Sequence, residues 1–333
     1  MLFLLSPAQP AQGEDLFSWR ETGASLALLQ GDQILWQFNH LGDGIEKGVP
    51  YFHPLATMDG AVLTDLHPDD HLWHRGLRFA WKIINGVEGY WVWPEGKARW
   101  PEKELGHTDV TGVEVFPGKD FSARFELELS YHPPGKPPAL TEKRTIVVGA
   151  PDENGDYQID WRGVFTAVGG DTLLDRTPIP GEEGGKAWGG YAGLQFRVSG
   201  RDNLAAWTIL NSEGIRIANK IDAQREEQKK SLERAHGKPA RWLDLTLDLA
   251  DGKTGGVTIL DHPDNLRHPA PWHVSSMPHE LICTPLYRGP YSLEEGKTLT
   301  FQFRIVVHPG GVGPDRVEKQ WEEFSQSAAP AAG

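Results

Sequence analysis

The sequence predicts an all-β protein in which two large sheets pack face to face, with a short helix near the C-terminus. Roughly fifteen strand-like runs lie along the 333 residues, and no strand–helix–strand alternation appears among them. The 38 glycines and 25 prolines supply the turns between such short strands. Hydrophobic residues make up 39% of the chain, which is enough for a large core. We therefore expect one β-sandwich, a supersandwich, over residues 18–312.

The clearest strand of the N-terminal half lies at residues 122–131. Ala123, Phe125 and Leu127 alternate there with charged residues, and this period of two is typical of a strand with one buried face. The other strands expected in this half are 25–29 and 33–38, which form a hairpin, then 78–84, 144–148 and 157–161. Residues 1–17 are expected to be a disordered tail or the remnant of a signal peptide.

A glycine-rich loop at residues 180–193 introduces the second half. Strands are expected after it at 194–198, 242–249, 256–260 and 298–308. Residues 222–236 are strongly charged, so we expect a solvated helix or a mobile insertion there, without chemistry. Residues 313–333 are expected to form a helix and a tail, because Val317, Trp321 and Phe324 lie on one helical face.

Charge and hydropathy narrow the classes of function. The net charge of −13, without a block of lysine and arginine, disfavours a nucleic-acid partner and is compatible with a neutral or polyhydroxylated ligand. No apolar segment reaches the roughly 20 residues that a membrane-spanning helix needs. Residues 1–13 resemble the end of a secretory signal, so we expect a periplasmic or extracellular protein, with the cytoplasm as the alternative. Cys283 is the only cysteine, so no internal disulfide forms.

The candidate site begins in the polar segment 65–76. Eight of the thirteen histidines lie in two windows, His53 to His74 and His262 to His279. Both windows are loop-like and the second directly follows an expected strand, which is where functional groups are usually placed on a β scaffold. We therefore predict that the two windows meet in one pocket.

Acid–base chemistry is the leading interpretation of these residues. His71 and His74 are the candidate acid and base, because an imidazole titrates near neutral pH, and Asp70 orients one of them. Arg75 is expected to hold a hydroxyl or carboxylate, or to stabilise an oxyanion. The candidate substrate-binding residues are His53, Trp73, Tyr191, His262, Asn265 and His268. Trp73 belongs to a cluster of tryptophans at 73, 81, 91, 93 and 100 that offers a surface for stacking a sugar ring.

Two other interpretations of the histidines stay open. Asp70, His71 and His74, with His53 or His262, could bind zinc, iron or copper. Individual histidines could instead have a purely structural role, as hydrogen-bond donors to backbone carbonyls of the loops. No nucleotide-binding glycine motif, Walker loop or serine-hydrolase elbow is present, so we expect no cofactor beyond a divalent metal in the first of these alternatives.

Four segments carry a resemblance to a known family: 51–55, 70–77, 261–269 and 299–308. They resemble the bacterial domain of unknown function labelled "PmoA-like" or "methane oxygenase", over residues 25–310. The resemblance implies a β-supersandwich similar to galactose mutarotases. Members often carry export signals and accompany sugar-oxidising dehydrogenases, which implies glycoside or keto-sugar metabolism. The insertion at 222–236 departs from the family pattern.

Analogy with mutarotases also implies a carboxylate base. Glu142, Asp160 and Glu280 are the candidates, and the sequence does not separate them. The leading hypothesis is a carbohydrate-active enzyme that works on a sugar or oxidised glycoside by epimerisation, elimination or hydrolysis. The alternatives are a metal-dependent oxygenase or hydrolase, and a sugar-binding module without catalysis.

Overall fold

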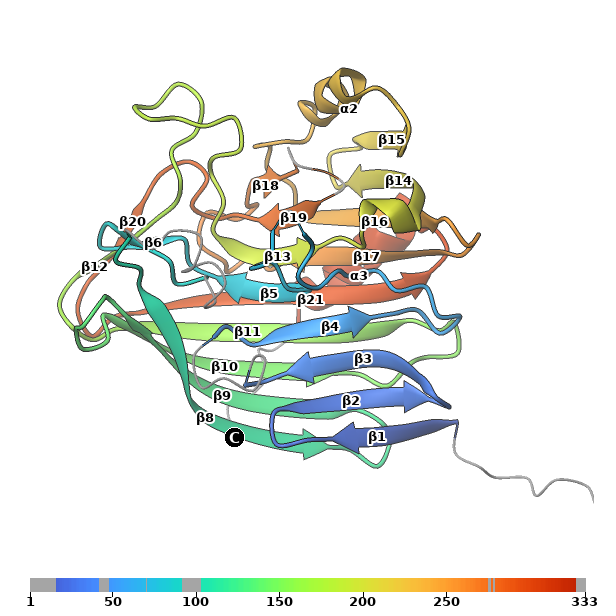
Figure 1. Ribbon diagram of the computed structural model, residues 1–333, viewed down its shortest axis with the longest axis horizontal. Coiled ribbons are helices and arrows are strands. Elements are labelled where there is room, and N and C mark those ends of the chain that lie inside the picture. Colours follow the sequence, from blue (N-terminus) through green and yellow to red (C-terminus); the bar gives the residue numbers. More distant parts are fainter. Residues whose placement is uncertain are drawn as a thin grey trace, which may run out of the picture.

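The computed structural model describes residues 16–41, 48–69, 71–91, 103–274, 277 and 279–327. Within them the chain is almost entirely β structure, arranged as two large sheets and one small one (Figure 1). Every strand pair is antiparallel, as expected where consecutive strands are joined by short turns. In the described part of the chain, no helix is long and apolar enough to span a membrane.

The first large sheet has eight strands. In spatial order they are β1 (Phe17–Glu21), β2 (Ser25–Gln30), β3 (Gln33–Asn39), β4 (Tyr51–Leu55), β5 (Leu77–Ala80), β13 (Gly193–Arg197), β19 (Glu280–Cys283) and β18 (Trp272–His273). The first five strands follow chain order, whereas the last three come from distant parts of the sequence. This end of the sheet therefore brings together segments about 200 residues apart.

The second large sheet has nine strands. In spatial order they are β15 (Arg216–Lys220), β14 (Leu204–Asn211), β16 (Trp242–Leu249), β17 (Thr254–Asp261), β21 (Thr298–Pro309), β11 (Tyr157–Ala167), β10 (Leu140–Val148), β9 (Ala123–His132) and β8 (His107–Pro117). The small sheet contains β20 (Tyr291–Leu293), β12 (Thr172–Asp175), β6 (Ile83–Ile84) and β7 (Val87–Glu88). A 3₁₀ turn at Arg201–Asn203 and the helices α2 (Arg225–Leu232) and α3 (Pro314–Ser325) complete the described elements.

Aromatic side chains fill the space between the two large sheets. Phe38 on β3 meets Phe125 on β9 with ring centroids 4.7 Å apart, and Phe79 on β5 meets Phe165 on β11 at 5.2 Å. These side chains are almost fully buried. Each contributes about 1.5–3 kcal/mol by leaving water. The predicted all-β class, with two sheets face to face and a short C-terminal helix, is confirmed.

Helix α3 follows from its own sequence. Pro314 occupies the start of the helix, where its missing N–H costs nothing. Val317 and Phe324 are buried and pack against Trp242 and Leu260 of the nine-stranded sheet. The helical periodicity therefore predicted both the element and its buried face.

The structure differs from the expected strand at 78–84. The chain leaves the eight-stranded sheet after Ala80 at the end of β5, bends at Lys82, and pairs again as β6 in the small sheet. Trp81, at the bend, is fully buried in the core. Because these residues are apolar except Arg78 and Lys82, the sequence reads as one run although it belongs to two sheets.

Candidate functional site

A cavity of about 1620 Å³ opens on the outer face of the eight-stranded sheet, at the end formed by β5, β13, β19 and β18. Two segments rise beside these strands, the loop between β12 and β13 and the region of α2 (Figure 1). Side chains of both segments line the cavity, together with residues of the polar loop before β5. The cavity is larger than the 300–1,000 Å³ typical of small-molecule sites, which leaves room for an extended ligand.

Strand alternation builds the floor of this cavity. In the antiparallel register Arg197 on β13 lies opposite Glu280 on β19, and Arg78 on β5 lies opposite Gln195 on β13. Arg78 Nε donates a hydrogen bond to Gln195 Oε1 at 2.9 Å. The intervening residues of the same strands, such as Phe196, point into the core. The floor is therefore a polar layer supported by rigid strands.

His71 and His74 lie together on the cavity wall. Their ring centroids are 4.6 Å apart, and the His74 N–H donates to the His71 carbonyl at 2.8 Å in a tight turn. Arg197 Nη1 donates to His74 Nδ1 at 3.3 Å. Because a guanidinium only donates, Nδ1 carries no proton and the neutral ring is protonated on Nε2. Burial, and then the charges of Arg78 and Arg197, hold the pKa of His74 well below its usual value.

Glu280 is the carboxylate that lies beside His74 in this cavity. It is 8% exposed, lines the cavity, and places Oε1 3.9 Å from His74 Nδ1. Burial raises the pKa of Glu280, while Arg78 and Arg197 oppose the rise. A buried glutamate with a raised pKa is a common proton-transfer group at neutral pH.

The two other candidate carboxylates belong to ion pairs elsewhere. Glu142 is held by buried Arg144, with Nε to Oε1 at 2.6 Å. Asp160 makes a bidentate pair with Arg304, at 2.6 and 2.9 Å. Neither lines the cavity. The structure therefore separates the three carboxylates that the sequence left equivalent, and it leaves Glu280 as the candidate base.

Lys82 is a cavity residue that the sequence did not single out. Its Nζ lies 4.3 Å from the centroid of the Trp91 ring, 5.3 Å from that of Tyr191, and 4.0 Å from Glu88 Oε2. Burial lowers the pKa of Lys82 to about 8, although Glu88 opposes the shift. The available signal was a single lysine inside the otherwise apolar stretch 79–84, where a charge needs a partner or a function.

His236 and His273 also line the cavity. Their ring centroids are 4.9 Å apart. The Val274 N–H donates to His236 Nδ1 at 3.3 Å, so His236 Nε2 bears the proton and faces the Tyr287 hydroxyl at 3.4 Å. Burial lowers the pKa of His236 to about 4 and, with His236 as a second cause, that of His273 to about 3. A neutral imidazole can donate one hydrogen bond and accept another.

These depressed pKa values predict that the protein loses stability in mild acid. An unfolded histidine binds a proton below about pH 6.5, whereas folded His236 and His273 stay neutral down to about 4 and 3. Their contribution is complete above pH 6.5 and is lost as the pH falls toward those values, by about 1.4 kcal/mol per pH unit for each residue. Urea unfolding between pH 4.5 and 7.5 measures the slope. An unchanged slope in His273→Asn would contradict this origin.

The structure brings some of the predicted residues together. His71, Trp73, His74 and Tyr191 all line the cavity. From the second histidine window, His273 and His279 line the same cavity. Asp70, the predicted orienting residue, lies outside the described residues. Residues 222–236, from which no chemistry was expected, contribute Gln228, Leu232 and His236, among others, to the wall.

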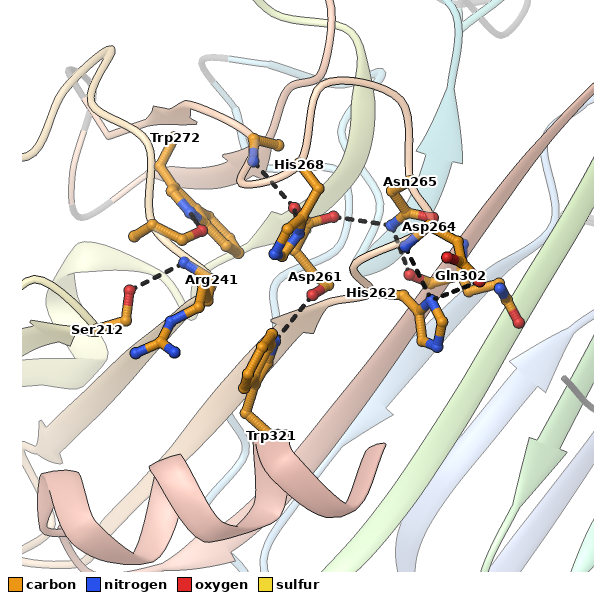
Figure 2. Close-up of polar contacts among 12 residues, drawn as sticks. Ser212, Arg241, Asp261, His262, Asp264, Asn265, His268, Trp272, Gln302 and Trp321 are labelled. Atoms are coloured by element: carbon orange, nitrogen blue, oxygen red, sulfur yellow. Dashed lines mark hydrogen bonds and ion pairs between the residues drawn. The ribbon is translucent and has the colours of Figure 1, made fainter. Parts of the chain in front are cut away.

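Three predicted sugar-binding residues lie elsewhere, in a cluster around Asp261 at the end of β17 (Figure 2). Asn265 Nδ2 donates to Asp261 Oδ1 at 2.7 Å, and His268 Nδ1 lies 2.8 Å from Asp261 Oδ2. Trp321 of α3 stacks on His268 with ring centroids 6.0 Å apart, and His262 contacts Phe324 of the same helix. None of the three lines the cavity, because the buried Asp261 carboxylate holds this loop over α3.

His53 and Arg75 also lie away from the cavity lining. His53 Nδ1 lies 2.9 Å from Thr64 Oγ1, and burial, followed by the charge of His67, lowers its pKa to about 4. Arg75 is completely buried, with its guanidinium carbon 6.0 Å from the centroid of the Tyr51 ring. The density of polar residues in the sequence did not indicate which of these side chains line the cavity.

Fold and site together define an all-β sandwich protein with a large, polar, strand-floored cavity. The chain belongs to the family of unknown function DUF6807, whose model matches residues 25–322. No curated protein matches this chain.

Among solved structures, the chain is similar to the galactosidase domain of the alpha-galactosidase-sucrose kinase AgaSK, with 12% identity and a TM-score of 0.37. That match covers 89% of this chain and 41% of the other, so this chain spans less than half of that protein's length. It is also similar to a galactose mutarotase related enzyme from Lactobacillus acidophilus, with 10% identity and a TM-score of 0.22. That match covers 88% of this chain and 97% of the other.

Proposed function

We propose that this protein is a carbohydrate-active enzyme that transfers protons on a sugar or an oxidised glycoside. One observation carries the proposal: Glu280 Oε1 and His74 Nδ1 lie 3.9 Å apart in the lining of a large cavity, and Arg197 donates to that histidine. A carboxylate whose pKa burial raises, beside a neutral imidazole of defined tautomer, forms a pair that can accept and return a proton. Paired strands carry Glu280 and Arg197 and hold these two residues in a fixed relative position.

The cationic groups beside this pair suit a reaction through an enolate. In the proposed step Glu280 takes the proton from a carbon next to a carbonyl, and the electron pair moves onto the carbonyl oxygen. Arg197 and Lys82 line the same cavity and supply positive charge for that oxygen. Return of the proton to the other face gives an epimer, whereas loss of a neighbouring substituent gives an elimination product. Hydrolysis stays the third reaction that this pair could support.

The charge of the cavity favours an anionic sugar derivative as substrate. Seven cationic side chains line its described walls, against three carboxylates, although the whole chain has a net charge of −13. The cations are Lys82, Lys103, Lys186, Arg197, Arg201, Arg225 and Lys229, and the carboxylates are Glu88, Glu233 and Glu280. A cavity lined by one sign of charge concentrates ligands of the opposite sign. A carboxylated sugar such as a uronide fits this field, and Trp73 and Trp91 offer rings for its apolar face.

Two more specific expectations are consistent with this proposal, although the proposal does not require them. The resemblance to the PmoA-like proteins implies glycoside or keto-sugar metabolism, and it stays a prediction. Export to the periplasm or outside the cell, where such substrates are released from polymers, also stays a prediction.

The test is turnover of a panel of neutral glycosides, 3-keto-glycosides and uronides, followed by proton NMR in D₂O. We expect conversion of at least one oxidised sugar, with deuterium entering at the carbon next to its carbonyl, and faster conversion of anionic substrates at low salt. Binding without turnover would instead establish a sugar-binding module. Activity that disappears with a chelator and returns with iron, copper or zinc would establish the metal-dependent alternative.

A further inference from the structure

A second group of ligating side chains lies at the edge of the nine-stranded sheet, outside the residues used above. His107 and Asp109 are on β8, and His132 ends β9. His107 pairs directly with His132 across the two strands, and Asp109 is two residues further along, so alternation puts all three side chains on the same face. The two imidazole rings stack with centroids 5.0 Å apart and an interplanar angle of 7°.

The ligand atoms are close enough for one ion. Asp109 Oδ2 lies 3.4 Å from His107 Nε2 and 3.7 Å from His132 Nε2, and one ligand atom from each residue lies within 4.8 Å of the other two. Zinc binds imidazole nitrogen and carboxylate oxygen at about 2.0–2.2 Å, so neighbouring ligands of a tetrahedral site are roughly 3.3 Å apart. Small side-chain rotations therefore suffice to close this triad around a metal.

Two further contacts favour a cation at this position. His132 Nδ1 lies 3.3 Å from the Lys136 carbonyl, and a hydrogen bond there leaves Nε2 as the ligating atom. Asp109 Oδ1 is buried and has no hydrogen-bond partner among the described residues, a condition that costs a carboxylate free energy unless a cation or water satisfies it. Ser130 Oγ lies 2.8 Å from His132 Nε2, and coordination would replace this single neutral hydrogen bond.

We propose that His107, Asp109 and His132 bind a divalent transition-metal ion of the zinc type. Two imidazoles and one carboxylate suit zinc, cobalt, nickel or copper better than magnesium or calcium, which prefer oxygen ligands. All three side chains are 20–27% exposed, so an ion can reach them and a water can complete the coordination. This proposal does not depend on the proposed function, because none of the three residues lines the cavity.

The position of the triad gives the metal a structural role at the cavity rim. β8 is an edge strand and starts two residues after Leu105, which lines the cavity. The Gly106 N–H donates to the Glu88 carbonyl, and Thr108 Oγ1 donates to the Tyr90 carbonyl, both at 2.8 Å. An ion that joins β8 to β9 would therefore also hold the wall segment 88–91 in place.

The test uses the full chain, dialysed against a chelator and then titrated with Co²⁺ and Zn²⁺. We expect one Co²⁺ per chain, with the visible absorption of a four- or five-coordinate ion, and a higher unfolding temperature with Zn²⁺, because the ion binds only the folded state. Asp109→Asn and His132→Ala should each weaken binding by roughly tenfold to a hundredfold or more. Glu114→Gln, an exposed carboxylate on the same strand, is the matched control and should bind as the wild type does.

Three results would overturn the proposal. One is the absence of both the Co²⁺ absorption and the Zn²⁺ stabilisation in the wild-type chain. The second is equal binding by the wild type and by both triad variants. The third is an equal loss of binding in the Glu114→Gln control. The Co²⁺ spectrum of the wild-type chain tests metal binding even if a variant folds poorly.

Discussion

Glu280→Gln is expected to lower kcat by roughly 10²- to 10⁴-fold, the usual contribution of a general acid or base. The substitution keeps the size of the side chain and removes its ability to exchange a proton. Glu280 is 8% exposed and interacts electrostatically with Arg78 and Arg197. Steady-state kinetics on the substrate found in the panel measures the effect. Since burial raises the pKa of Glu280, the acid limb of kcat/KM in the wild type should lie above the usual 4.5.

The control for this experiment is Glu294→Gln, an exposed glutamate between β20 and β21, which should keep wild-type kcat. Circular dichroism and the unfolding temperature show whether Glu280→Gln stays folded. A folded Glu280→Gln variant with more than about a tenth of wild-type kcat would exclude Glu280 as the proton-transfer group. Sugar binding measured by calorimetry should survive the substitution, which separates catalysis from recognition.

Glu142→Leu is expected to cost about 3–5 kcal/mol of unfolding free energy, the usual penalty for removing one partner of a buried ion pair. Glu142 and Arg144 are each 1% exposed, and Arg144 donates to both carboxylate oxygens, at 2.6 and 2.7 Å. The Tyr131 hydroxyl also donates to Glu142. Without the carboxylate, the guanidinium would stay charged in the core without an anionic partner among its described contacts, over the Trp161 ring at 4.7 Å. Urea denaturation at pH 7 measures the loss.

The double variant Glu142→Leu with Arg144→Met tests whether the unpaired charge of Arg144 causes this loss of stability. It should recover most of the lost stability, because both buried charges are then absent. Glu128→Leu is the matched control on neighbouring β9, where the side chain is 62% exposed, and it should change stability by less than about 0.5 kcal/mol. A loss below about 1 kcal/mol for Glu142→Leu would mean that solvent reaches Arg144.

The sequence predicted most of the fold because its strands carry a local signal. The alternation of Ala123, Phe125 and Leu127 marks the buried face of β9, and the spacing of Val317, Trp321 and Phe324 marks that of α3. The small third sheet was missed, because β6 and β7 are only two residues long and carry too few residues to show a period. β6 was also merged with β5, since both are apolar.

The structure brings only some of the predicted site residues into the cavity. His71, His74 and Tyr191 stand out by residue type, and all three line the cavity. Arg197 and Lys82 did not stand out, because each is a single charge in an apolar run whose outward direction depends on the sheet that it joins. His262 and His268 were grouped with the site because they are histidines near Asp261, yet that carboxylate ties His268 and its loop over α3.

The sequence by itself determined the all-β class, the main strands and the C-terminal helix, since periodicity and turn residues act over short distances. Only the tertiary structure decided which polar residues meet. β13 joins the sheet beside β5 from about 110 residues further along the chain, and β19 and β18 from about 200. This pairing sets Arg197 against Glu280 and brings both to His74. Register between distant strands depends on the packing of the whole core, and no single segment encodes it.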